Sequence, residues 1–130
     1  MNFIRNSEEI ENARRSGQIL TQVLDKLEKS IKPGVTAKQL DKIAKDETER
    51  LGGKPAFLGY QGFPAHLCVS VNNEIVHGIP TDKEIKQGDL VGIDYGVNYG
   101  GMITDAARTV SVGKPSQDSK KLINYFALAA

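Results

Sequence analysis

The stretch "GIDYGVNYGGMITDAARTV", Gly92–Val110, decides the fold because it contains two apolar segments around a glycine-bearing turn. Its β-branched and aromatic residues predict two strands, at Leu90–Val97 and Met102–Val110. Two strands joined by so short a turn form an antiparallel hairpin. The sequence therefore predicts an antiparallel sheet.

Each strand of this hairpin carries one aspartate, Asp94 in the first and Asp105 in the second. A two-residue loop at Tyr99 and Gly100, or a four-residue loop at 98–101, places the two aspartates directly opposite each other. Their side chains then leave the same face of the sheet, with Cβ atoms about 4.5–5.5 Å apart. A three-residue loop would shift the register by one residue and separate them.

Two carboxylates in this arrangement repel each other, so the pair needs a proton, a cationic side chain or a metal ion nearby. The hairpin alone leaves three explanations open. A metal ion binds both aspartates, Arg108 pairs with Asp105, or one aspartate ends its strand in solvent.

The composition limits the classes of protein to which the chain can belong. Its 130 residues are 39% hydrophobic and 25% charged, which predicts one soluble globular domain, residues 1–130, with a modest core. Lys and Arg total 17 and Asp and Glu total 16, so the charge balance favours neither nucleic acid nor a membrane surface as a partner. The sequence contains no signal-peptide core and no membrane-spanning apolar run. Because Cys68 is the single cysteine, an internal disulfide is excluded and we expect a cytoplasmic location.

Two amphipathic helices are expected before the hairpins. The first spans Ser7–Lys29. Its apolar stripe comprises Ile10, Ala13, Gly17, Leu20, Leu24 and Leu27. The second begins at Thr36, which forms a capping box with Gln39, and ends at Gly52-Gly53. Its apolar face comprises Leu40, Ile43, Ala44 and Leu51.

A second hairpin is predicted in "GFPAHLCVSVNNEIVHGIP", Gly62–Pro80, because the asparagines at its centre tolerate positive φ. A turn at 72–73 sets His77 opposite Cys68, so that both share one face of the sheet. A histidine at a strand end is more often a hydrogen-bonded structural residue than a catalyst, and both interpretations stay open. We expect His66 at the surface or at a rim.

The motifs of these hairpins also resemble a known family. "VSVNNEIVHGIP", "GDLVGIDYGVNYGG" and "DAARTVSVGKP" occur in the order and spacing of the first half of type I methionine aminopeptidases, and "LGYQGFP" and "KPGVTAKQLD" agree with them. The resemblance covers roughly residues 7–115. It implies an α/β (α+β) chain that forms half of a pita-bread fold, with two N-terminal helices packed on an antiparallel sheet of hairpins.

By this resemblance, the chain matches part of a metallopeptidase site. Asp94 and Asp105 match two aspartates that hold a pair of divalent ions, for which Co, Mn, Fe and Zn are the candidates. His77 matches the histidine that hydrogen-bonds the scissile amide and stabilises the tetrahedral intermediate. The residues that match the pocket for the substrate's methionine side chain are Phe57, Tyr60, Phe63, Cys68 and His77. The implied reaction removes the N-terminal methionine from nascent proteins.

The sequence departs from the family in three places. Ile103-Thr104 stands where the family commonly has His-Gly, which puts bulk and a hydroxyl near the expected metal position. The family's remaining ligands, one histidine and two glutamates, belong to a second half that does not occur in this chain. Residues 117–130 are an atypical ending, which we interpret as a truncated C-terminal helix.

Three hypotheses follow from these observations. The chain is a methionine aminopeptidase half that needs ligands from elsewhere, a non-catalytic pita-bread half that acts as a binding or self-assembling module, or a cysteine hydrolase that uses Cys68 and His77. Half of a two-part fold exposes apolar surface, so we expect a homodimer or a complementary C-terminal half as partner. The expected substrate is a peptide or nascent-protein N-terminus, and neither nucleic acid nor a membrane is expected as a partner.

Overall fold

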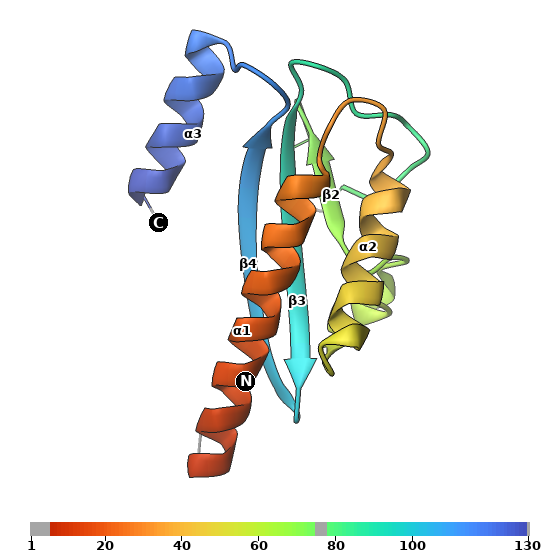
Figure 1. Ribbon diagram of the computed structural model, residues 1–130, viewed down its shortest axis with the longest axis vertical. Helices are drawn as coiled ribbons and strands as arrows, with labels where there is room; N and C mark the ends of the chain where they lie inside the picture. The colour runs from red at the N-terminus through yellow and green to blue at the C-terminus, as the bar shows by residue number, and fades with distance from the viewer. Residues whose placement is uncertain (1–5, 75–77, 130) are drawn as a thin grey trace.

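The computed structural model describes residues 6–74 and 78–129, and Figure 1 shows the arrangement of its elements. In chain order these are α1 (Ser7–Ser30), α2 (Ala37–Arg50), β1 (Lys54–Pro55), the short 3₁₀ helix η1 (Tyr60–Gly62), β2 (Cys68–Val71), β3 (Leu90–Tyr99), β4 (Met102–Ser111) and α3 (Gln117–Ala129).

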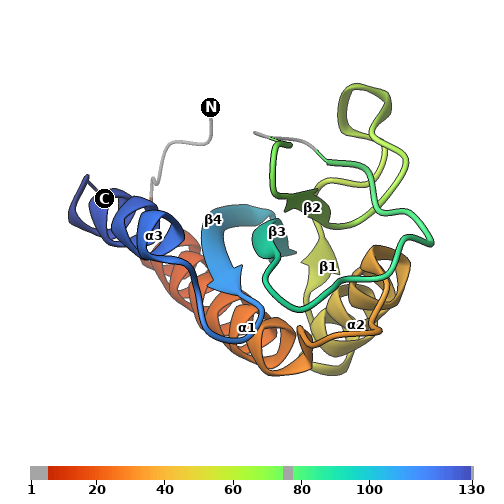
Figure 2. The same cartoon turned by 90° about the horizontal axis from the view of Figure 1, so that it is seen from above.

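The strands form one antiparallel sheet with β3 at its centre. β4 pairs with β3 along one edge over its whole length, while β2 and β1 pair in turn along the other edge. α1 and α2 lie side by side on one face of this sheet, as Figures 1 and 2 show. The expected architecture, two N-terminal helices packed on an antiparallel sheet, is confirmed.

The register of the β3–β4 hairpin differs from the prediction by two residues. The loop is Gly100-Gly101, with φ of 57° and 83°, and Tyr99 pairs with Met102. Positive φ at both loop residues is typical of the tight turn that suits strand twist, and glycine adopts it without the steric cost that tyrosine would bear. Asp94 therefore pairs with Ala107 and not with Asp105. The predicted direct opposition of the two aspartates is wrong.

α1 begins and packs largely as its sequence predicts. The Asn6 side chain caps it by accepting a hydrogen bond from the Glu9 N–H at 2.9 Å. Its buried residues are Ser16, Ile19, Leu20, Val23, Leu24 and Leu27. Ile10 was expected on this stripe but is 42% exposed, because the first turns of α1 extend beyond the sheet (Figure 1).

α2 carries the predicted capping box. The Gln39 N–H donates to Thr36 Oγ1 at 3.2 Å, and the Thr36 N–H donates to Gln39 Oε1 at 2.9 Å. These two bonds satisfy donors that the first helical turn cannot pair internally. Leu40 and Ala44 are fully buried, so the predicted apolar face does meet the core.

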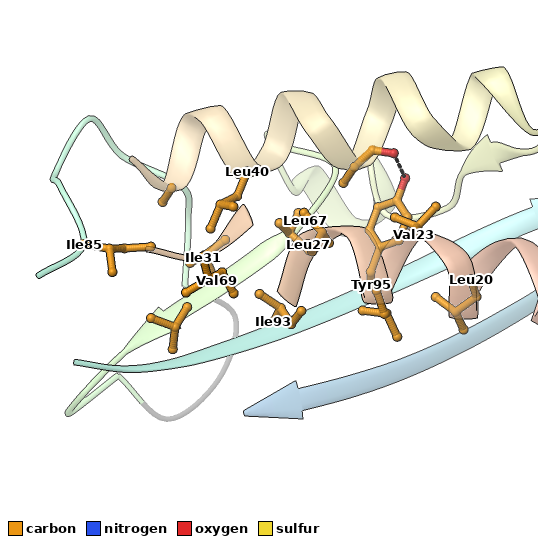
Figure 3. Close-up of a cluster of buried hydrophobic side chains, with 14 of the residues drawn as sticks. Leu20, Val23, Leu27, Ile31, Leu40, Leu67, Val69, Ile85, Ile93 and Tyr95 are labelled. Atoms are coloured by element: carbon orange, nitrogen blue, oxygen red, sulfur yellow. Dashed lines mark hydrogen bonds between the residues drawn. The ribbon is translucent and has the colours of Figure 1, made fainter. Parts of the chain in front are cut away.

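The core lies between the helices and the sheet, and Figure 3 shows part of it. On β3 its members are the alternating residues Val91, Ile93, Tyr95 and Val97. Tyr95 is fully buried, and its hydroxyl lies 2.8 Å from the Thr48 hydroxyl of α2. Burial raises the pKa of Tyr95 to about 12, so the phenol stays neutral. Because successive strand residues point to opposite faces, the even-numbered residues of β3 face away from this core.

Candidate metal and substrate site

The sheet face that points away from the helices gathers the predicted chemistry. On β3 this face carries Asp94 and Gly96. Cys68 of β2 pairs with Asp94, and Asp105 of β4 pairs with Gly96. Residues that pair across antiparallel strands share a face, so Cys68 and both aspartates lie together. The two carboxylates are diagonal neighbours on one face. The prediction that they share a face therefore holds, although the predicted register does not.

These residues form the floor of a cavity of about 630 Å³. The residues that line it are Phe57, Tyr60, Gln61, Gly62, Phe63, Pro64, Cys68, Ile79, Asp94 and Asp105. The structure thus brings the four described pocket candidates, Phe57, Tyr60, Phe63 and Cys68, to the same cavity as both aspartates. An apolar pocket that ends at two carboxylates can hold an uncharged side chain beside a cationic group.

Four residues of this lining were not predicted, namely Gln61, Gly62, Pro64 and Ile79. Gln61 and Pro64 come from the loop around η1, where Gln61 has a positive φ of 48° and Gly59 a φ of 80°. The Gly59 N–H closes this loop by donating to the Phe63 carbonyl at 2.9 Å. The "GYQGFP" run, with its two glycines, was the available signal that this loop folds back over the sheet.

Arg108 does not neutralise Asp105. Its guanidinium donates to Asp25 Oδ1 at 2.6 Å and to Glu28 Oε2 at 2.7 Å, both on α1. Arg108 pairs with Ile93 of the core, so it points to the helix face while Asp105 points to the cavity. The alternative in which Arg108 compensates the aspartate pair is therefore wrong.

Thr104 also faces the helices. Its hydroxyl lies 2.8 Å from the buried Ser16 hydroxyl of α1, which itself donates to the Val97 carbonyl at 2.9 Å. The expectation that Thr104 adds a hydroxyl near the aspartates is wrong, because neighbouring strand residues point to opposite faces. Ile103 does share the face of Asp105, and it is 52% exposed.

Cys68 is buried on the cavity floor. Burial, together with the negative charge of Asp94, raises the pKa of the Cys68 thiol to about 11. A thiol nucleophile needs the opposite environment, one that lowers its pKa and stabilises the thiolate. The surroundings of Cys68 therefore argue against the cysteine hydrolase.

Of the two histidines, only His66 lies within the described residues. His77, and its expected pairing with Cys68, lie outside the described residues; the Val69 N–H donates to the Gly78 carbonyl at 3.0 Å, so the chain runs beside β2 by residue 78. The His66 side chain, expected at the surface or at a rim, is 19% exposed, and its Nδ1 lies 2.9 Å from Asp41 Oδ2. His66 does not line the cavity that holds the aspartates.

The donor set of the site suits divalent metal ions in part. Carboxylate oxygens are ligands for manganese, iron, cobalt and zinc alike, and Asp94 and Asp105 both line the cavity. Within residues 6–74 and 78–129, no three side chains of His, Cys, Asp or Glu gather in a geometry that could hold a metal ion. The described residues thus offer two candidate carboxylate ligands, Asp94 and Asp105.

Comparison with known proteins assigns the class. The model of metallopeptidase family M24 matches residues 11–129, and the chain belongs to this family. Its relatives include the methionine aminopeptidase of Clostridium perfringens, 45% identical over 123 residues that cover 95% of this chain and 49% of the relative. The methionine aminopeptidase of Aquifex aeolicus is 47% identical over 122 residues, which cover 88% and 47% of the two chains.

A solved structure supports the same assignment. The crystal structure of methionine aminopeptidase from Rickettsia prowazekii matches with a TM-score of 0.91 at 34% identity, covering 99% of this chain and 53% of that one. The expected half of a pita-bread fold is confirmed by this match. The chain spans about half the length of the curated relatives that it matches. None of the helices in the described residues combines the length and the apolarity that crossing a membrane requires.

Proposed function

We propose that this chain provides the N-terminal half of a metal-dependent methionine aminopeptidase, which removes the N-terminal methionine from nascent proteins in the cytoplasm. One observation carries the proposal: an apolar cavity of about 630 Å³ has Asp94 and Asp105 in its lining. The similarity to methionine aminopeptidases over most of this chain supports it.

In this proposal the aromatic residues Phe57, Tyr60 and Phe63 surround the methionine side chain of the substrate. A flexible, polarisable thioether packs well against aromatic rings, so the lining suits methionine. Asp94 and Asp105 hold divalent ions of Co, Mn, Fe or Zn, which when bound polarise a peptide carbonyl and provide a nucleophile near neutral pH. His77 donates a hydrogen bond at the scissile amide, the role implied by the family resemblance.

The proposal also requires a partner, because two carboxylates do not complete the site. We propose a complementary C-terminal half as that partner, since the relatives are about twice as long as their match to this chain. The cavity side of the sheet supports this: Tyr60 is 69% exposed, Ile79 56% and Ile103 52%. Exposed apolar groups around a cavity mark an interaction surface.

A second candidate function is a binding or self-assembling module without catalysis, including a homodimer of this chain. The observation that favours it is the lack of a third metal ligand within residues 6–74 and 78–129. A homodimer would bring two Asp94–Asp105 pairs to one interface, and the four carboxylates would need metal ions between them.

Hydrolysis of a Met-Ala-Ser peptide separates these functions. We expect the chain mixed with the C-terminal half of its Clostridium perfringens relative to release methionine in the presence of Mn²⁺ or Co²⁺. Chelator should abolish this activity, and so should Asp94→Asn, while Asp82→Asn, at an exposed carboxylate outside the cavity lining, is the matched control. Sedimentation of the chain alone, at micromolar concentration, reports whether it forms a homodimer. A dimer that binds metal but stays inactive with the complementary half would favour the binding module.

A further inference from the structure

Gly96 lies at a crowded place on the sheet face that carries the cavity. It is buried in the middle of the pairing between β3 and β4, opposite Asp105. A Cβ atom at this position would lie 2.6 Å from Phe57 Cε1, 3.1 Å from Cδ1 and 3.2 Å from Cζ. The Phe57 ring therefore lies in the space that any larger side chain at residue 96 would need.

Phe57 is held in this place from several sides. The Ala56 N–H donates to the Gly96 carbonyl at 3.0 Å, which fixes the backbone next to Phe57 against β3. The Phe57 carbonyl accepts from the Tyr60 N–H at 3.0 Å. The ring itself meets Tyr95 edge to face, with centroids 6.4 Å apart and planes inclined by 65°. These contacts fix both the backbone and the ring of Phe57. A side chain at residue 96 would therefore have to displace a ring that is held in place.

Gly92 shows that this crowding is local. It lies on β3 four residues before Gly96 and on the same face of the sheet, and it pairs with Thr109. A Cβ atom there would meet only the Ser70 carbonyl oxygen at 3.6 Å and Ser70 Cβ at 3.8 Å, which are ordinary van der Waals contacts. The need for glycine at residue 96 thus comes from the Phe57 ring and not from the strand.

We propose that Gly96 is a specificity-determining position, which acts by seating the Phe57 ring against the sheet and so fixing the width of the side-chain pocket. This inference rests on the proposed function, because it takes the pocket to hold the first side chain of the substrate. Phe57 and Asp105 both line the cavity and both adjoin Gly96. The seated ring is accordingly a part of the cavity wall beside the pair of Gly96 and Asp105, and we expect a methyl group at residue 96 to push it into the volume that the substrate side chain needs.

The test uses NMR on the chain, with L-methioninamide and L-alaninamide as probes and no metal. In the wild type, the Phe57 ring current should shift a Gly96 Hα resonance upfield, and Phe57→Leu should remove that shift. Methioninamide should bind more tightly than alaninamide. Gly96→Ala should weaken methioninamide binding about fivefold or more, as expected when a packed site is overfilled. Gly92→Ala, the matched control, should bind as the wild type does.

The double variant tests whether Gly96→Ala weakens methioninamide binding by displacing the Phe57 ring. Once Phe57→Ala has removed the ring, adding Gly96→Ala should change methioninamide binding no further. Additive losses, a Gly96→Ala variant that binds like the wild type, or an unshifted Gly96 Hα would overturn the inference. An upfield-shifted Gly96 Hα in a chain that binds neither amide would overturn the substrate role of Gly96, while the seating of Phe57 would stand. The proposed function is tested separately, by hydrolysis of the Met-Ala-Ser peptide with the complementary half.

Discussion

Acid should destabilise this fold through one buried carboxylate, Glu47, which ties α2 to α1. Its side chain is 7% exposed and accepts from Lys26 Nζ at 2.9 Å and from Arg50 Nη2 at 2.6 Å. Hydrogen bonds from Arg50 and Lys26 lower the pKa of Glu47 from 4.5 to about 2. Because the folded state holds the ionised form, this stabilisation is fully present above pH 4.5 and is lost as the pH falls towards 2.

The magnitude follows from the same geometry. A pKa drop from 4.5 to about 2 would correspond to roughly 3 kcal/mol if all three charges were shielded from water. The side chains of Lys26 and Arg50 are 52% and 65% exposed, so solvent screens much of this attraction. We therefore expect Glu47 to contribute about 1–2 kcal/mol to the free energy of unfolding at pH 7.

The assay is urea denaturation at several values between pH 2 and pH 7. Glu47→Gln should flatten the loss of stability below pH 4.5, because the amide cannot titrate. Glu49→Gln is the matched control, since Glu49 lies on the same helix, is 54% exposed and lies 3.9 Å from Lys45. If both variants keep the pH dependence of the wild type, the acid sensitivity does not come from Glu47 and the reasoning is refuted.

Three further predictions follow from local geometry. Tyr95→Phe and Thr48→Val should each cost about 1 kcal/mol in denaturation experiments, because the hydroxyl that remains in each variant keeps a hydrogen bond to the Ala44 carbonyl, at 2.7 Å from Thr48 and at 3.3 Å from Tyr95. Gly17→Ala, in open space on α1, should raise the melting temperature by the equivalent of about 0.5–1 kcal/mol, whereas Gly101→Ala, at φ 83°, should lower it. Calorimetry of the isolated chain with Mn²⁺ should give weak binding that Asp105→Asn removes, and nanomolar affinity would contradict a shell of two carboxylates.

The sequence predicted the strands of the central hairpin but not its register. Strand positions follow from β-branched and aromatic content, whereas register depends on which two residues adopt positive φ. A loop of Tyr99 and Gly100 requires positive φ at tyrosine, and the Gly100-Gly101 loop avoids this cost. Preferring the glycine pair would have given the observed pairing of Asp94 with Ala107 from sequence alone.

Strand alternation and the family resemblance together predicted part of the site. Both aspartates and the four described pocket candidates do line one cavity. The Thr104 hydroxyl was predicted near the aspartates because Thr104 adjoins Asp105 in the sequence, but successive strand residues point to opposite faces. Gln61, Gly62, Pro64 and Ile79 were not predicted because they lie outside the regular strands and long helices, where no hydrophobic period describes the path of the chain.

The two faces of the sheet have different roles: one carries the hydrophobic core and the other carries the candidate site. The helix face carries the core, and its polar groups are bound to α1, as Arg108 is to Asp25 and Thr104 is to Ser16. The opposite face carries Asp94, Asp105 and exposed apolar groups such as Ile103. The core of β3 is completed by α1 and α2, so the half contains its own hydrophobic core. The cavity lies on the other face of the sheet and touches that core through Phe57 and Tyr95, so we expect what binds there, whether a complementary half, metal ions or a substrate, to complete the site without rebuilding the fold.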